Sequence, residues 1–299
     1  MTLTAGVTTR PGLLDHRALD LEGAARVTYR LEQTFRYDYT EPVTSVRQRL
    51  VIVPPARHGD ATLVHHSLDV LGAVSRKTIR HHGGSSDSSS VVRVSADRVE
   101  EFIEFRLTAH VERAGDRRLA ELPSKALRDA RWRQLTRLTT PDAALHDWAA
   151  ELHRDGERPE DTAQRICSAV HARMTYEFGI TGTSTTAAQA LAGGRGVCQD
   201  YAHIALALCH ELGLPARYVS GHLLGQGGTH AWFEVLVDAG DRVVAIPFDP
   251  CNDRRAGRGY LTIATGRDYA DVAPTAGTYE GPLSGQLSST RRLGVVSLA

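Results

Sequence analysis

The chain of 299 residues contains little cysteine, no excess charge and no long apolar run. Its four cysteines include no CxxC pair and are too few for a disulfide scaffold, so we expect free thiols in a reducing compartment, the cytoplasm. Lys plus Arg and Asp plus Glu number 35 each, which argues against a nucleic-acid partner or an anionic membrane surface. No stretch approaches the roughly 20 apolar residues of a membrane span. Residues 1–20 lack the basic start and apolar core of an export signal.

The first part of the chain has the pattern of a β-rich domain. Residues 1–24 are polar and lack periodicity, so we expect a loose leader. Between residues 25 and 115, six segments alternate apolar and polar residues, as strands with one buried face do. They occupy 26–39, 46–55, 62–73, 75–82, 89–96 and 99–113, with a serine-rich link near 83–90. This series predicts an N-terminal β-sandwich-like domain.

The second part, residues 116–285, has the pattern of helices packed on a sheet. Apolar residues recur every three or four positions in 141–156 and 159–178, as in amphipathic helices. A short helix at 184–194, capped by Ser184 or Thr185, and a longer one from about Cys198 to Leu212 follow. Segments 216–224, 230–238 and 242–249 alternate as antiparallel strands. The chain is therefore predicted to be α+β, and residues 286–299 are expected to form a C-terminal tail.

Cys198 follows the glycine-rich turn GGRGV and begins a long apolar helix, which a structural cysteine does not require. The thiolate is the attacking form of cysteine, and the N–H groups at a helix N-terminus favour an anion there. Gly194 and Gly196 allow a tight turn and close approach of a substrate. The N–H of Cys198 can also meet a developing oxyanion. This position predicts a nucleophile.

A nucleophilic cysteine also needs a base and a group that orients the base. His230 begins a predicted strand after a glycine-rich loop, and Asp249 ends the next predicted strand. The short turn DAGDR makes these strands antiparallel neighbours, so the start of one lies beside the end of the other. Cys198, His230 and Asp249 are therefore predicted to meet as a catalytic triad.

Four motifs resemble the bacterial branch of the transglutaminase-like superfamily: RGVCQDYAHIALALCHELGLPARYVSGHL, THAWFEV, PFDPCND and TIATGRDYADVAPTAGTYEG. The segment FRYDYTEPVTSVRQRLVIVPP also resembles the β-rich domain that precedes the core in this branch. The resemblance implies a papain-related core with Cys198 as nucleophile, His230 as general base and acid, and Asp249 as orienter. It further implies thiol-dependent acyl transfer on a peptide or carboxamide bond, without a metal or organic cofactor.

Two positions depart from the superfamily pattern. The eukaryotic cross-linking enzymes have a tryptophan directly after the nucleophile, whereas this chain has Gln199, which leaves hydrolysis and other acyl acceptors open. We take Gln199 and Trp232, two residues after His230, as candidates for substrate or oxyanion contacts. Cys251 stands where a hydroxyl residue such as threonine is expected, so redox pairing with Cys198 is an alternative to plain packing.

Two other functions are compatible with the same residues. Cys198, His230 and Asp249 include residue types that bind zinc, so a zinc-dependent hydrolase is one alternative. The other is a non-catalytic interaction module that keeps the fold without its chemistry. For the leading hypothesis, the expected partner is a peptide or protein substrate, with neither nucleic acid nor membrane. The sequence leaves the oligomeric state open.

Overall fold

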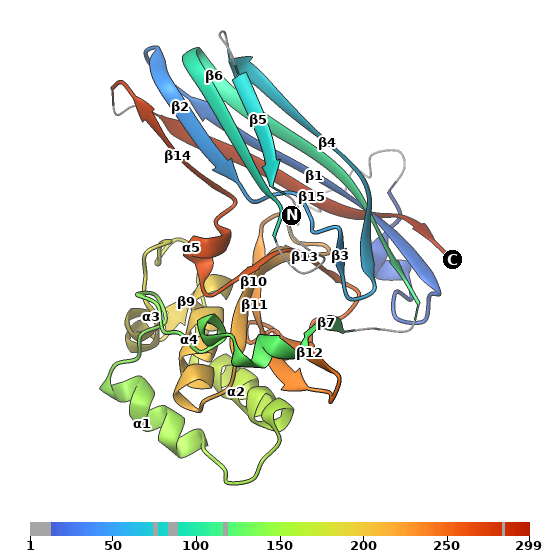
Figure 1. Ribbon diagram of the computed structural model, residues 1–299, viewed down its shortest axis with the longest axis vertical. Coiled ribbons are helices and arrows are strands. Elements are labelled where there is room, and N and C mark those ends of the chain that lie inside the picture. The colour runs from blue at the N-terminus through green and yellow to red at the C-terminus, as the bar shows by residue number, and fades with distance from the viewer. Residues whose placement is uncertain (1–12, 74–76, 83–88, 116–118, 283–284) are drawn as a thin grey trace, which may run out of the picture.

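The computed structural model describes residues 13–73, 77–82, 89–115, 119–282 and 285–299. These residues form a large antiparallel sheet next to a second unit, in which helices pack against a smaller sheet (Figure 1). The predicted α+β class is confirmed. In the described part of the chain, no helix combines the length and the apolar character that crossing a bilayer requires.

The first sheet has eight strands. They are β1 (Arg26–Asp38), β2 (Val43–Leu50), β3 (Arg57–His58), β4 (Ala61–Ala73), β5 (Lys77–His82), β6 (Val91–Ala114), β14 (Thr275–Glu280) and β15 (Gln286–Leu298). The long strand β6 covers two segments predicted as separate strands, and it pairs with β1, β2, β4 and β5. Hydrogen bonds through β6 therefore join these strands into one continuous sheet, which differs from a sandwich of two separate sheets. The predicted link near 83–90 lies mostly outside the described residues.

Both ends of the described chain belong to this sheet. The prediction of a C-terminal tail at 286–299 is wrong, because β15 pairs with β1 from Val27↔Leu298 to Asp38↔Gln286. The edge of β1 offers unpaired backbone groups that a returning strand can satisfy. The expected loose leader is also wrong for residues 13–24, where a 3-10 turn forms at His16–Ala18 and the N–H of Leu14 donates to the carbonyl of Val295 at 2.8 Å. Residues 1–12 lie outside the described chain.

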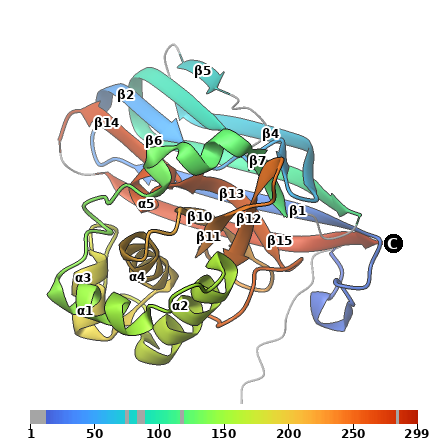
Figure 2. The ribbon, with the colours of Figure 1, turned by 60° about the horizontal axis from the view of Figure 1, so that its bottom comes forward.

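The second unit contains a five-stranded sheet, in the order β13-β10-β11-β12-β7, with helices against it (Figure 2). Its strands are β7 (Ala120–Pro123), β10 (Ala216–Leu223), β11 (His230–Asp238), β12 (Arg242–Phe248) and β13 (Tyr260–Gly266), with the small pair β8 (Thr175–Tyr176) and β9 (Arg195–Gly196) apart. Its helices are α1 (Ala143–Leu152), α2 (Pro159–Arg173), α3 (Ala187–Gly193), α4 (Cys198–Glu211) and α5 (Tyr269–Val272), with 3-10 turns at Ser124–Arg128 and Ala130–Trp132. The cap of α3 is Thr186, whose hydroxyl accepts from the N–H of Gln189, rather than Ser184 or Thr185.

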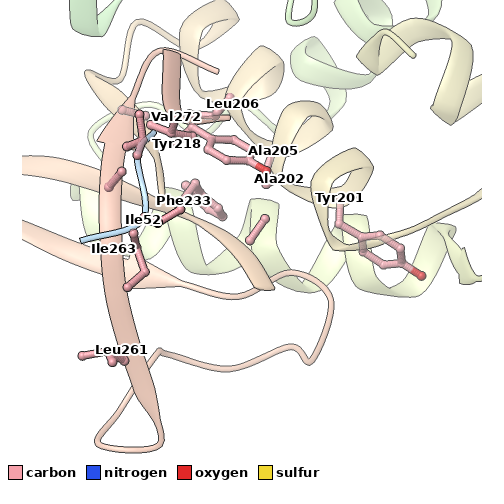
Figure 3. Packing of buried hydrophobic residues seen from close by; sticks show 14 of the residues in the cluster. Ile52, Tyr201, Ala202, Ala205, Leu206, Tyr218, Phe233, Leu261, Ile263 and Val272 are labelled. Carbon is pink, nitrogen blue, oxygen red and sulfur yellow. The ribbon is translucent and has the colours of Figure 1, made fainter. Parts of the chain in front are cut away.

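Helix α4 is the centre of the second unit. Every residue from Gln199 to Cys209 is buried, as expected for a helix surrounded by protein rather than half exposed to water. Figure 3 shows its side chains packed towards Tyr218 and Phe233 of the sheet. Ile52, from the first sheet's side, lies with Ile263 in the same cluster, so one apolar core joins the two units. This packing holds the N-terminus of α4 in a fixed position.

Candidate active site

The backbone before α4 places Cys198 at an open helix end. Gly194 ends α3 in the left-handed conformation, with φ of 64°. A side chain at Gly196 would lie 2.5 Å from Oδ2 of Asp200, which itself accepts from the N–H of Val197 at 2.8 Å. Glycine is therefore required where the chain turns closely around this carboxylate. Cys198 follows as the first residue of α4, with a partly exposed side chain.

The hairpin of β11 and β12 brings His230 beside Asp249. The strands pair antiparallel with Phe233 opposite Phe248, so the first residue of β11 lies next to the residue that follows β12. The imidazole Nε2 of His230 lies 2.7 Å from Oδ2 of Asp249, and both side chains are buried. The side chain of Cys198 is close enough to the imidazole to help raise its pKa. The structure thus brings together the three residues predicted as a triad.

The Asp249 carboxylate accepts hydrogen bonds on both oxygens. Besides His230, Oδ2 accepts from the hydroxyl of Tyr260 at 2.6 Å and from Nδ2 of Asn252 at 2.7 Å. Oδ1 accepts from the backbone N–H of Cys251 at 2.9 Å and of Asn252 at 3.3 Å. Burial alone would raise the pKa of Asp249, but these donors and the charge on His230 lower it below 3.8. The group therefore stays ionised and oriented.

The charge state of His230 follows from its two neighbours. Burial of the ring lowers its pKa, but the hydrogen bonds with Asp249 and Cys198, and the negative charges of both, outweigh burial and raise the pKa to about 9. The imidazole therefore carries two protons at neutral pH. An imidazolium in contact with a sulfur holds the proton that a leaving amine needs.

Trp232 and Gln199 make different contacts near the triad. Trp232 is only 1% exposed and packs behind the imidazole, with ring centroids 6.1 Å apart from His230 and 5.4 Å from Tyr260. Its indole Nε1 has no hydrogen-bond partner in the described part of the chain. Gln199 is also buried, and its side-chain Nε2 donates to the carbonyl of Gly182 at 3.3 Å. These contacts support the imidazole and a neighbouring loop, while roles towards substrate stay predictions.

The other cysteines differ in their surroundings. Cys167 and Cys209 are buried in the core. Cys251 is partly exposed, and burial together with the negative charges of Asp249 and Cys198 raises the pKa of its thiol to about 12. Cys251 is therefore a protonated thiol at neutral pH, which disfavours the redox pairing considered above.

The zinc alternative needs three or more ligands in one place. Across the described residues, no group of at least three His, Cys, Asp or Glu side chains is arranged to hold a metal ion. Asp249 directs both oxygens at hydrogen-bond donors. The chemistry of this donor set fits an orienting carboxylate better than a metal ligand.

The sequence reasoning missed three residues that complete the site. Tyr260, at the start of β13, donates to Asp249, and Nε of Arg254 in turn donates to the Tyr260 hydroxyl at 2.8 Å. Asn252 donates to the same carboxylate from the turn after β12. An amide three residues after Asp249 is a weak local signal for such a turn. Tyr260 has no local signal, because it comes from a strand on the far side of β10 and β11.

The site lies inside a region that matches a known family. Residues 146–250 match the model of the transglutaminase-like superfamily, and this range includes Cys198, His230 and Asp249. The chain is similar to an uncharacterised protein of Mycobacterium leprae, with 37% identity over 156 residues that cover 49% of this chain and 53% of that protein. An uncharacterised protein of Mycobacterium tuberculosis is 33% identical over 146 residues, or 45% of this chain and 46% of that protein. The chain thus spans about half the length of the curated relatives it matches.

The overall fold also has a solved counterpart. A protein of Cytophaga hutchinsonii described as a candidate cysteine protease has a TM-score of 0.68 and 20% sequence identity. The match covers 90% of this chain and 98% of that chain. At this identity the likeness concerns the fold, which includes the large N-terminal sheet as well as the helical unit.

Proposed function

Because residues 146–250 match the transglutaminase-like superfamily, we propose that the chain is a thiol-dependent hydrolase or acyltransferase acting on a peptide or side-chain carboxamide. The observation that carries the proposal is the His230 imidazole, which contacts the Asp249 carboxylate at 2.7 Å and the Cys198 side chain at the start of α4. Nucleophile, base and orienter in one hydrogen-bonded chain are the arrangement that acyl transfer through a thioester requires.

In the first half of the proposed reaction, the Cys198 sulfur attacks the substrate carbonyl carbon. A C–S bond forms and the carbonyl π electrons move onto oxygen. The N–H groups of Cys198 and Gln199, at the helix end, are the candidates to stabilise this oxyanion. When the intermediate collapses, the C–N bond breaks and His230 passes its proton to the leaving nitrogen. The products are an amine or ammonia and a thioester on Cys198.

In the second half, water or a primary amine attacks the thioester carbon. His230 takes the proton of the attacking group, and the C–S bond breaks as the second tetrahedral intermediate collapses. The acyl group leaves as an acid or a new amide, and the imidazolium and sulfur return to their starting state. Asp249 holds the Nε2–H of the imidazole throughout, so the other ring nitrogen is the one that gives up and takes back the proton.

Trapping the acyl-enzyme tests the proposal. The full chain is incubated with a library of carboxamide-bearing peptides, with and without a primary amine, and the peptide containing Cys198 is examined by mass spectrometry. We expect an acyl adduct on Cys198 in wild type and in Cys251→Ala, and none in Cys198→Ala. Turnover by Cys198→Ala, or stoichiometric zinc whose removal by a chelator stops turnover, would replace this mechanism with another.

A further inference from the structure

The segment 175–182 lies against the N-terminus of α4 and is attached at both of its ends. At its start, Thr175 and Tyr176 pair in parallel with Arg195 and Gly196. The N–H of Glu177 also donates to the carbonyl of Gly196 at 2.9 Å. These bonds join the segment to the backbone that leads directly into Cys198.

The far end of the segment is attached to the first turn of the same helix. The hydroxyl of Thr181 donates to Oδ2 of Asp200 at 2.7 Å. The side chain of Gln199 donates to the carbonyl of Gly182 at 3.3 Å. Asp200 and Gln199 immediately follow Cys198, so the whole segment is positioned by the helix end that presents the nucleophile.

Between these attachments, three large apolar side chains face solvent. Tyr176 is 55% exposed, Phe178 is 87% exposed and Ile180 is 44% exposed. No other stretch of five described residues has more than one large apolar residue exposed to this degree. A local group of exposed apolar side chains marks a binding surface more often than chance exposure does. We name these three residues the apolar strip.

The apolar strip begins at the nucleophile. Tyr176 pairs with Gly196, which lies two residues before Cys198 in the chain. From the other end of the strip, at Ile180, a hollow of about 660 Å³ continues over Ser184 and Gln189. A chain extended along this surface would run from the sulfur, across Phe178, into the hollow.

The size of the strip limits what can cover it. A fully covered aromatic side chain buries about 150–250 Å². Because Tyr176 and Ile180 are already about half covered, the three residues offer less than the roughly 800 Å² per partner of a stable protein interface. One or two side chains of a bound peptide match this area, whereas a second copy of the chain does not. Since the strip adjoins the sulfur, the peptide that fits is one whose carbonyl is under attack.

We propose that the apolar strip binds a large aliphatic or aromatic side chain of the substrate, next to the carboxamide that Cys198 attacks. This inference rests on the proposed function and specifies its substrate class: peptides with a bulky apolar residue beside the reacting group. Phe178, the most exposed member, is the specificity-determining residue.

The test uses pairs of peptides that differ only by Phe, Leu or Gly at positions flanking the reacting carboxamide. We expect wild type to have a higher kcat/KM for the Phe and Leu peptides than for the Gly peptide. Phe178→Ala should lose about tenfold in kcat/KM for the apolar peptides, the loss typical of a missing apolar contact in a specificity pocket. The kcat/KM of this variant for the Gly peptide should change little. Phe178→Leu should retain most of the preference.

Val64→Ala is the matched control, because Val64 is 63% exposed on β4, in the other sheet. The alkylation rate of Cys198 by iodoacetamide should be equal in all variants, since this small reagent does not need the strip. For each variant, kcat/KM for the Phe and Leu peptides is divided by kcat/KM for the Gly peptide. If this ratio is the same in wild type and Phe178→Ala while the acyl-enzyme still forms, the inference is overturned and the proposed function stands. A change of oligomeric state in Phe178→Ala, measured by light scattering, with unchanged selectivity also overturns it. Alkylation without any acylation by the library overturns both.

Discussion

Replacing Asp249 by Asn removes the group that holds the proton on His230. The asparagine amide has nearly the same shape, but it is uncharged and its single oxygen cannot accept both from the imidazole and from the backbone N–H of Cys251, as the two carboxylate oxygens do. The carboxylate supplies the largest of the effects that raise the pKa of His230, and burial, which lowers this pKa, remains in the variant. We therefore expect the imidazole pKa to fall from about 9 towards 6.5. A difference of about 2.5 corresponds to about 3 kcal/mol between the two protonation states.

The titration of His230 measures this shift directly. In protein labelled with ¹⁵N-histidine, the His230 signal is identified by its loss in His230→Gln, and its midpoint is followed from pH 5 to 10. Asp268→Asn is the matched control, because Asp268 is also buried but accepts from the N–H of Ala270 at the start of α5. A His230 midpoint near 6.5 in wild type, or one left unchanged by Asp249→Asn, would refute the reasoning.

The same shift has a consequence for stability. Since the pKa of His230 is raised in the folded state, its contribution to the free energy of unfolding is fully present below pH 6.5 and is lost as the pH rises through about 9. The pKa of Asp249 is lowered, so its contribution is present above pH 3.8 and is lost as the pH falls. Urea unfolding should therefore show the largest gap between wild type and Asp249→Asn between about pH 4 and 6.5, narrowing towards pH 9.

Three further variants test other parts of the site and the core. Tyr260→Phe removes a 2.6 Å hydrogen bond to the orienting carboxylate and should lower both turnover and, by about 1.5–3 kcal/mol, the free energy of unfolding. Tyr37→Phe is the control: it loses a 2.7 Å hydrogen bond in the first sheet and should lower stability without changing turnover. Equal turnover in Tyr260→Phe and Tyr37→Phe would show that Tyr260 does not contribute to the site. Cys198→Ala should abolish acylation with little change in melting temperature, whereas Cys251→Ala should still acylate; the reverse pattern would exchange their roles. Glu234→Gln removes the negative charge that lies 2.7 Å from a buried arginine and should lower the free energy of unfolding at pH 7. Burial would raise the pKa of Glu234, but that arginine and a neighbouring histidine lower it to about 2. The contribution of Glu234 to the free energy of unfolding is thus present above pH 4.5 and lost as the pH falls through about 2. A difference in this free energy between wild type and Glu234→Gln that stays constant with pH would contradict this.

Much of the local structure could be predicted because it follows from short-range patterns. The alternation in residues 26–38 is that of β1, and the stop at Gly213 after α4 reflects the loss of helical preference at glycine. Local patterns misplaced the start of α3 by one or two residues and divided β6 in two. Ser184, Thr185 and Thr186 have similar preferences for the N-cap position, so the sequence does not distinguish between them. Only the folded chain shows that Thr186 caps α3.

The sequence alone determined which residue types stand at a helix start, at a strand start and at a strand end, and these are Cys198, His230 and Asp249. The meeting of His230 and Asp249 was predictable because they lie at the same end of a short hairpin. Tertiary structure decided the rest: that β15 returns to β1, that Tyr260 reaches Asp249, and that Phe178 stays exposed two residues after the strand that pairs with β9. Such contacts join residues far apart in the chain. Many partners could satisfy the same strand edge or carboxylate, so no local pattern specifies which one does.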